Sequence, residues 1–107
     1  MDTLSKLKNN GIVIKQEDLA KLCIKYKIKE LSVFGSVIRE DFNDKSDVDF
    51  LISFEKDSAL TLFHLIDLKE EFSELIGREV DIVEKEGVTN PIRKKIIFES
   101  AEKVYGA

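Results

Sequence analysis

Two groups of residues that can bind phosphate and metal stand close together in this chain. Gly35 and Ser36 follow the apolar run 31–34, and ten residues later Asp47 and Asp49 begin a second apolar run. Side chains on an extended strand alternate between its two faces, so both aspartates would lie on one face. Carboxylate oxygens are hard ligands that suit Mg²⁺, an ion that proteins often share with substrate phosphates.

The glycine and serine complement these carboxylates. Gly35 allows a ligand to approach the backbone closely, and Ser36 is a favourable helix N-cap whose following N–H groups form an anion site. Two carboxylates about 4 Å apart repel by about 4 kcal/mol near a protein surface, and a divalent cation removes that repulsion. The combination of a phosphate site with a metal site predicts phosphoryl or nucleotidyl transfer.

The spacing of the two motifs resembles the G-S-x10-D-x-D signature of the DNA polymerase β-like nucleotidyltransferase superfamily. Arg39 and Ser46 match the same signature, whereas Glu40 stands where many relatives have glycine. The chain looks most similar to the minimal nucleotidyltransferases, which are antitoxins of HEPN-domain toxins, and the resemblance extends from about Gln16 to the C-terminus. Either motif alone would be weak evidence, but both together, each at the end of a strand-like run, are specific.

The resemblance implies both an activity and a set of site residues. It implies transfer of AMP from ATP to a hydroxyl, in this group a tyrosine of a HEPN-domain toxin, with two Mg²⁺ ions clamping the attacking and leaving oxygens. It assigns metal binding and catalysis to Asp47, Asp49 and Asp81, and nucleotide contacts to Gly35, Ser36 and Arg39.

The third carboxylate is also visible as a local anomaly. Asp81 lies in the apolar run Val80 to Val83, where a charge is unfavourable unless another group compensates it. If this run pairs with the second strand, Asp81 joins the face of the other two aspartates. Glu79 has the same parity along the strand and is the competing candidate, and a carboxylate facing water at a sheet edge is the alternative interpretation.

Three further features favour structural roles. Arg93, Lys94 and Lys95 form a basic run that is typical of a solvated helix face, although a phosphate or partner contact by Arg93 is an alternative. His64 has no second ligand at metal-binding spacing and is expected to be structural. Cys23 lies at helical spacing among apolar residues and is expected to be a buried small hydrophobe.

Two other classes of function compete with AMP transfer to a protein. A pure binding module would neutralise its partner by contact, but it would not need three aspartates in this pattern. Transfer to a small molecule would need a further lobe to hold the acceptor, and the predicted elements leave little chain for one. The apolar residues 12–14 and Tyr105 are the candidates for a partner contact surface.

Composition is that of one soluble domain. The chain has 107 residues, of which 43% are hydrophobic and 36% charged, and its net charge of −4 disfavours direct binding to nucleic acid or an anionic membrane. With one cysteine it forms no internal disulfide, which is typical of a reducing cytoplasm. The sequence shows neither a signal peptide nor a transmembrane segment.

Hydrophobic periodicity predicts an α/β (α+β) fold, a small mixed sheet covered by helices, with residues 1–107 as a single domain. Residues 2–8 are expected to form one or two helical turns. Helices are predicted at about 16–27, 36–40, 60–76 and 91–100, and strands at about 30–34, 47–54 and 79–84, with a short edge strand at 103–105.

Overall fold

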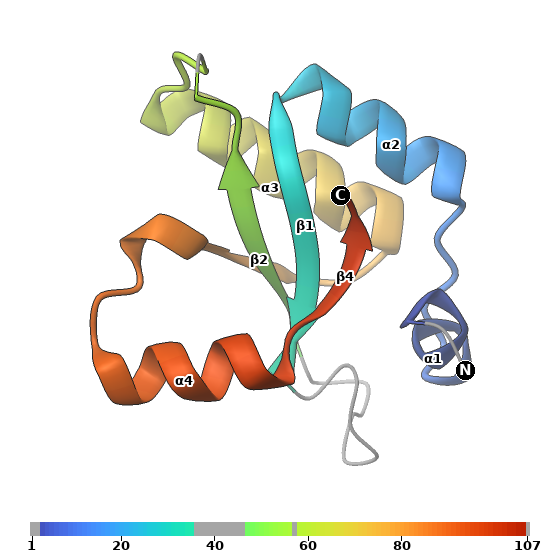
Figure 1. The fold of residues 1–107 in the computed structure, drawn as a ribbon. Helices are drawn as coiled ribbons and strands as arrows, with labels where there is room; N and C mark the ends of the chain where they lie inside the picture. The colour runs from blue at the N-terminus through green and yellow to red at the C-terminus, as the bar shows by residue number, and fades with distance from the viewer. Residues whose placement is uncertain (1–2, 36–46, 57, 107) are drawn as a thin grey trace.

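The computed structural model describes residues 3–35, 47–56 and 58–106, and within them the chain forms a four-stranded sheet and four α-helices (Figure 1). The strand order is β3-β2-β1-β4, in which β1 pairs antiparallel with β2 and β4, and β2 pairs parallel with β3. The predicted mixed sheet is therefore confirmed. The strands are β1 Ile28–Phe34, β2 Val48–Phe54, β3 Val80–Glu84 and β4 Glu102–Tyr105; the helices are α1 Thr3–Asn9, α2 Gln16–Lys25, α3 Leu62–Ile76 and α4 Pro91–Ser100.

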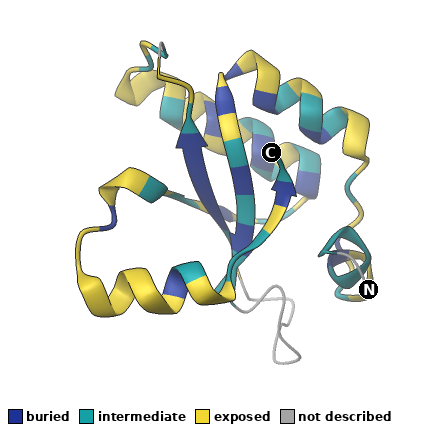
Figure 2. Cartoon of the chain, in the orientation of Figure 1, coloured by how far each residue is buried: buried dark blue, intermediate teal, exposed yellow. Residues whose placement is uncertain are grey.

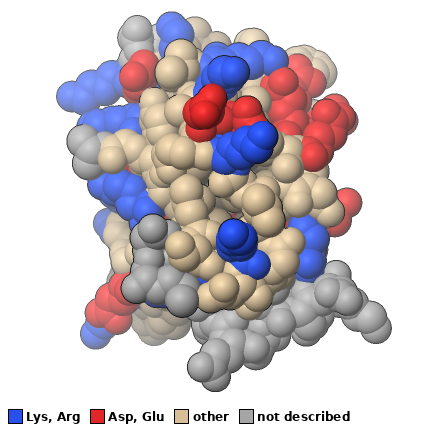
Figure 3. Space-filling model, turned by 90° about the vertical axis from the view of Figure 1, so that its right-hand side faces the viewer, with Lys and Arg blue, Asp and Glu red and all other residues tan. Residues whose placement is uncertain are grey.

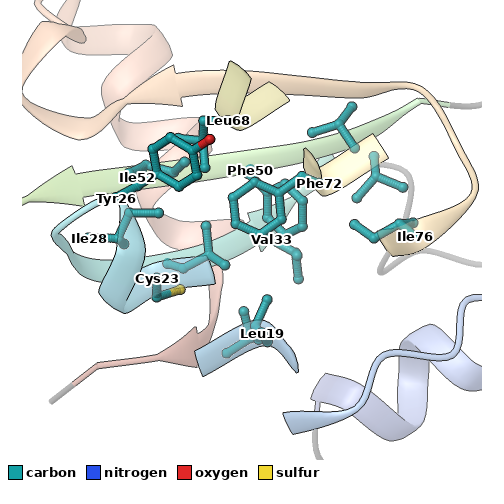
Figure 4. Close-up of a cluster of buried hydrophobic side chains, with 14 of the residues drawn as sticks. Leu19, Cys23, Tyr26, Ile28, Val33, Phe50, Ile52, Leu68, Phe72 and Ile76 are labelled. Atoms are coloured by element: carbon teal, nitrogen blue, oxygen red, sulfur yellow. The ribbon is translucent and has the colours of Figure 1, made fainter. Parts of the chain in front are cut away.

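The main core fills the space between the sheet and helices α2 and α3. Phe50 of β2 and Phe72 of α3 are fully buried at its centre, with ring centroids 5.0 Å apart (Figure 4). A second, smaller cluster lies on the other face of the sheet, where Leu51 packs with Ile97 of α4. Because β2 contributes to both clusters, nearly the whole strand is buried (Figure 2).

Local signals fix the ends of α3 and α4. The Thr61 N–H donates to His64 Nδ1 at 3.1 Å, which closes the first turn of α3 and confirms the structural role predicted for His64. Gly77 ends α3 in the left-handed conformation, with φ of 76°. The Asn90 side chain accepts N–H bonds from the first turn of α4, and Pro91 occupies its first position.

The first third of the chain differs from the prediction in two respects. Helix α2 ends at Lys25, two residues early, because Lys27 has φ of 54° and the chain turns there into a β1 that starts at Ile28. Of residues 12–14, which were candidates for a partner surface, Ile12 is fully buried in the main core, whereas Val13 is 66% exposed. The buried Ile12 instead anchors the segment between α1 and α2.

The apolar residues of α3 between Leu62 and Ile76 predict a broad buried face, and the structure buries only part of it. Leu68, Phe72 and Ile76 are buried as expected, but Leu62 and Ile66 are 71% and 49% exposed. Ile66 lines a hollow beside β3, the strand at this edge of the sheet. None of the described helices is both long and apolar enough to cross a membrane.

Charged and uncharged surfaces are separated on the face that carries α1. Figure 3 shows a broad, mostly uncharged area on this face, with a Lys or Arg side chain within it and charged side chains of both signs around it. Glu30 of β1 joins the sheet to the η2 turn, Lys85–Gly87, through an ion pair with Lys85. The described residues of these surfaces therefore carry charges of both signs side by side.

The Glu30 contacts predict an acid-sensitive contribution to stability. Hydrogen bonds from Lys103 (3.0 Å) and Lys85 (3.2 Å) hold the pKa of the Glu30 carboxyl below its usual range. A lowered folded-state pKa gives stability that is present above the unfolded pKa of about 4.3 and is lost as pH falls through the folded pKa. We expect Glu30→Gln to lower the free energy of unfolding near neutral pH and the difference from the parent to shrink in acid.

Urea denaturation at about pH 7 and about pH 3 measures that difference. Glu99→Gln on the exposed side of α4 is the matched control and should change little at either pH. A destabilisation by Glu30→Gln that is equally large at both pH values would show that the charge of Glu30 is not its source.

Candidate active site

The sheet register brings the predicted aspartates to one region. Asp49 of β2 lies directly beside Asp81 of the parallel strand β3, and its neighbour on the other side is Phe34 of β1. Asp47 is exposed and immediately precedes β2. Val48, Phe50 and Ile52 are fully buried against α2 and α3, so alternation places Asp47 and Asp49 on the opposite face, together with Leu51 and α4.

Gly35 is matched to Asp49. It follows the last residue of β1 with φ of 77°, a conformation that favours glycine. A Cβ atom added to Gly35 would lie 2.5 Å from Asp49 Oδ2, closer than two such atoms can pack. The carboxylate of Asp49 therefore occupies the space that any side chain at position 35 would need, which couples the two motifs of the sequence physically.

This coupling predicts a larger effect at Gly35 than at another glycine of the same conformation. Gly77 has φ of 76° and no atom within 4 Å of an added Cβ, so Gly77→Ala isolates the conformational cost, about 1–2 kcal/mol. We expect Gly35→Ala to lower the free energy of unfolding by more than Gly77→Ala and to reduce catalytic activity as well, because Asp49 must move. Equal costs in urea denaturation with full activity would contradict the coupling.

Asp81 is exposed, whereas Asp49, its neighbour in the register, is half-buried. The Asp81 side chain is 55% exposed, and Lys69 Nζ of α3 lies 3.8 Å from Asp81 Oδ1. Sequence reasoning missed Lys69, because nothing in its helix distinguishes it from the other solvated lysines. The contact shows that α3 reaches around the sheet edge to the aspartate region.

The aspartates supply suitable ligands for Mg²⁺, although they are not gathered into a tight cluster. Among the described residues, no three acidic, histidine or cysteine side chains are grouped at metal-binding distances. The donor set nonetheless consists of hard carboxylate oxygens on neighbouring strands, and the missing side chain of Gly35 leaves room for the Asp49 carboxylate. Such oxygens are the ligands that Mg²⁺ prefers, so the residues fit this ion.

Of the other predicted residues, some lie outside the described part of the chain and Arg93 lies within it. Ser36 and Arg39, predicted to contact the nucleotide, lie outside the described residues, as do Ser46 and the predicted helix at 36–40. Arg93 is exposed on α4 and lines a hollow of about 240 Å³ with Val83 and Asn90, apart from Asp49.

Glu79 and Cys23 are both accounted for by their surroundings. Glu79 is exposed, and its backbone carbonyl accepts the Val48 N–H at 3.0 Å. Cys23 is fully buried as predicted, and burial raises the pKa of its thiol to about 12. A thiol in this state is protonated near neutral pH and does not act as a nucleophile.

Comparison with known proteins gives a family and named relatives. Residues 17–106 match the sequence model of the family described as "Polymerase beta, Nucleotidyltransferase". The chain is 36% identical over 75 residues to protein adenylyltransferase MntA of Thermococcus cleftensis, covering 70% of this chain and 74% of that protein. It is 38% identical over 99 residues to a Methanocaldococcus jannaschii protein provisionally named a protein adenylyltransferase, covering 92% of this chain and 95% of that one.

Solved structures share the fold. One that is provisionally described as a minimal nucleotidyltransferase is 32% identical, with a TM-score of 0.68 and 94% of each chain covered. A crystal structure of a toxin–antitoxin with AMP-PNP gives a TM-score of 0.70 at 16% identity, covering 88% of this chain and 75% of that one. The sheet and its covering helices are thus those of a known class of nucleotidyltransferase structures.

Proposed function

Because the chain belongs to the polymerase beta nucleotidyltransferase family, we propose that it transfers AMP from ATP to a hydroxyl group of a partner protein. The observation that carries the proposal is the register of Asp49 beside Asp81 on neighbouring parallel strands, with Gly35 against Asp49. This arrangement places carboxylates on one face of the sheet, next to the end of β1 from which the predicted phosphate-binding segment departs. The relatives named as protein adenylyltransferases support a protein acceptor.

The partner in this proposal is a HEPN-domain toxin, and the acceptor is a tyrosine. A solved structure that shares this fold is described as a tri-AMPylated HEPN toxin from Shewanella oneidensis in complex with an MNT antitoxin. At 16% identity that likeness concerns the fold. The named adenylyltransferase relatives support a protein acceptor, and its identity as a HEPN toxin rests on the motif resemblance. The chain would then act as an antitoxin that inactivates its partner by modification.

In the mechanism, side chains and backbone of this chain bind the metal ions and the phosphates, and one carboxylate accepts a proton. Asp47, Asp49 and Asp81 would hold two Mg²⁺ ions, which neutralise charge on the phosphates when bound. The backbone around Gly35 and Ser36 binds the phosphates, and Arg39 contributes a positive charge toward them. Asp81 accepts the proton of the acceptor hydroxyl. The acceptor oxygen bonds to the α-phosphorus as the bond to the bridging oxygen breaks, and pyrophosphate leaves.

A binding module that neutralises its partner by contact is the second candidate. Exposed apolar side chains on α3 and α4 favour it, since Phe63 and Ile92 are 77% and 74% exposed. Such residues are typical of protein interaction surfaces whether or not chemistry follows. The two candidates therefore differ in covalent modification of the partner and not in complex formation.

The test is to incubate the protein with ATP labelled at the α-phosphate, Mg²⁺, and the product of its neighbouring gene, which the proposal expects to be a HEPN-domain protein. We expect label on a tyrosine of the HEPN protein, lost when either protein or Mg²⁺ is omitted and lost with Asp47→Asn. A stable, neutralising complex that never acquires label would establish the contact-only module in place of the enzyme.

A further inference from the structure

Strand β3 is a sheet edge that carries Asp81. It is the first strand in the order β3-β2-β1-β4, and the described part of the chain places no strand on its outer side. The Val48 N–H donates to the Glu79 carbonyl. Along a strand, the backbone N–H and C=O groups of successive residues point to opposite sides. The groups of Glu79, Asp81 and Val83 therefore point toward β2, and the groups of Ile82 and Glu84 point outward.

An apolar ridge on α3 lies beside this edge. Leu62 and Ile66 form the ridge, at i and i+4 of the helix and 71% and 49% exposed, and Lys69 follows on the same side. Figure 2 shows the first turn of α3 as an exposed end of the helix. A hollow of about 250 Å³ connects the ridge to β3 and is lined by Leu65, Ile66, Lys69, Asp81, Ile82 and Glu84.

We propose that this edge receives the acceptor protein: an extended segment of the partner pairs with β3 and rests apolar side chains against the α3 ridge. The inference rests on the proposed function and specifies how the acceptor reaches the site. Added strands gain affinity from main-chain hydrogen bonds and specificity from pockets for alternate side chains. The outward groups of Ile82 and Glu84 supply the bonds, and the hollow supplies the pocket.

Alternation of side chains then places the acceptor. A residue of the added strand opposite Asp81 has its Cβ about 5 Å from the Asp81 Cβ and lies on the same face. Its neighbours on either side point to the other face, toward Ile66 and Ile82. A tyrosine opposite Asp81 therefore brings its hydroxyl over the aspartates, while the flanking residues fill the hollow with apolar groups.

Charge at the edge selects the segment further. Of the three charged residues that line the hollow, Asp81 and Glu84 are acidic, and Lys69 pairs with Asp81 at 3.8 Å. A lysine or arginine in the segment would complement Glu84. The acceptor tyrosine is thus expected in an apolar stretch that also contains a basic residue.

The chemical step on the docked segment is balanced within the proposed function. The tyrosine oxygen forms the new bond to the α-phosphorus of ATP, and its proton passes to the Asp81 carboxylate. The α-phosphorus loses its bond to the bridging oxygen, which leaves with the electron pair as pyrophosphate. Docking at β3 lowers the entropic cost of this encounter by holding the hydroxyl at the site.

Helix α4 offers a matched control. Ile92 and Ile96 are also at i and i+4 of a helix and are 74% and 64% exposed. The hollow beside α4 is lined by Arg93, and neither Ile92, Ile96 nor any aspartate lines it. The same substitutions on the two helices therefore change exposed apolar pairs at the same spacing, of which only the α3 pair includes a residue, Ile66, that lines the hollow with Asp81.

The first experiment compares two double variants. The α3 variant carries Leu62→Ser and Ile66→Ser, and the α4 variant carries Ile92→Ser and Ile96→Ser. With the HEPN-domain acceptor identified by the labelling test, we expect the α3 variant to raise KM for the acceptor by about tenfold or more, because a few buried side chains carry most of the binding energy of an interface. KM for ATP and the melting temperature should match those of the α4 variant. Equal acceptor KM values for the two variants would overturn the docking site.

A second measurement follows the edge directly and does not need the enzyme to turn over. Hydrogen exchange of the outward Ile82 amide should slow by roughly tenfold or more when the HEPN protein binds, while β4 at the other edge is unchanged. Protection at β4 or α4 without protection at β3 would overturn the proposal. If the parent protein transfers no AMP but β3 is protected, the proposed activity fails and the docking site stands.

A charge reversal completes the test. Glu84→Lys should weaken binding of the acceptor protein. Glu99→Lys on α4 makes the same change in net charge away from the hollow. We expect the acceptor KM to rise several-fold more for Glu84→Lys than for Glu99→Lys, and the gap to narrow at high salt. An identical response of the two variants would contradict the assigned charge complementarity.

Discussion

Replacing Asp47 and Asp49 by asparagine is expected to abolish AMP transfer while the protein stays folded. Asn has nearly the volume of Asp, so the contact of Asp49 with Gly35 and the buried face of Val48, Phe50 and Ile52 are kept. Both negative charges are lost, and with them the ligands proposed for Mg²⁺. Removing one preorganised electrostatic group typically costs about 10²–10³-fold in rate, and two such groups should cost more.

Thermal melting provides the physical readout of this prediction. A ligand that binds the folded state raises its melting temperature by mass action, so Mg²⁺ with ATP should stabilise the parent and stabilise the double variant much less. Asp67→Asn, an exposed carboxylate of α3, is the matched control and should keep full transfer and the full ligand-induced shift. Transfer by the double variant at the rate of the parent would show that the metal assignment is wrong.

Alternation along β2 is the feature that the sequence predicted best. Every second residue from Val48 to Phe54 is apolar, which required a core on one side of the strand. The structure buries Val48, Phe50 and Ile52 completely and Phe54 partly. The position of Asp81 beside Asp49 followed only if β3 paired with β2, and the register confirms that condition. Helix ends were predictable where a single residue defines them, as Gly77 does at the end of α3 and Asn90 at the start of α4.

What the sequence did not predict depends on distant parts of the chain. Ile12 looked like a spare apolar residue, and only the packing of α1 and α2 around it reveals that it is buried. Leu62 and Ile66 continue the apolar period of α3 but are exposed, and the sequence does not encode locally which turns of the helix the sheet covers. The contact of Lys69 with Asp81 joins a helix to a strand, so neither segment alone carries a signal for it.

Replacing Asp81 by asparagine is expected to lower kcat by about 10²–10⁴-fold, the range for loss of a positioned general base. The reason is its place: Asp81 stands beside Asp49 in the register and is open to an incoming acceptor at the sheet edge. Glu79 shares the parity of Asp81 but lies just before β3. We therefore expect Glu79→Gln to change kcat by only a few-fold.

The comparison of Asp81→Asn with Glu79→Gln decides between the two candidates for the third carboxylate, because each removes one negative charge at nearly constant volume. Single-turnover rates with ATP and the HEPN acceptor separate the chemical step from acceptor binding. Lys69→Gln adds a third measurement: it removes the ion-pair partner of Asp81 and keeps the carboxylate, so it should retain most of the rate that Asp81→Asn loses. A large loss with Glu79→Gln and a small one with Asp81→Asn would transfer the role to Glu79, and the acceptor would then have to approach from the start of β3.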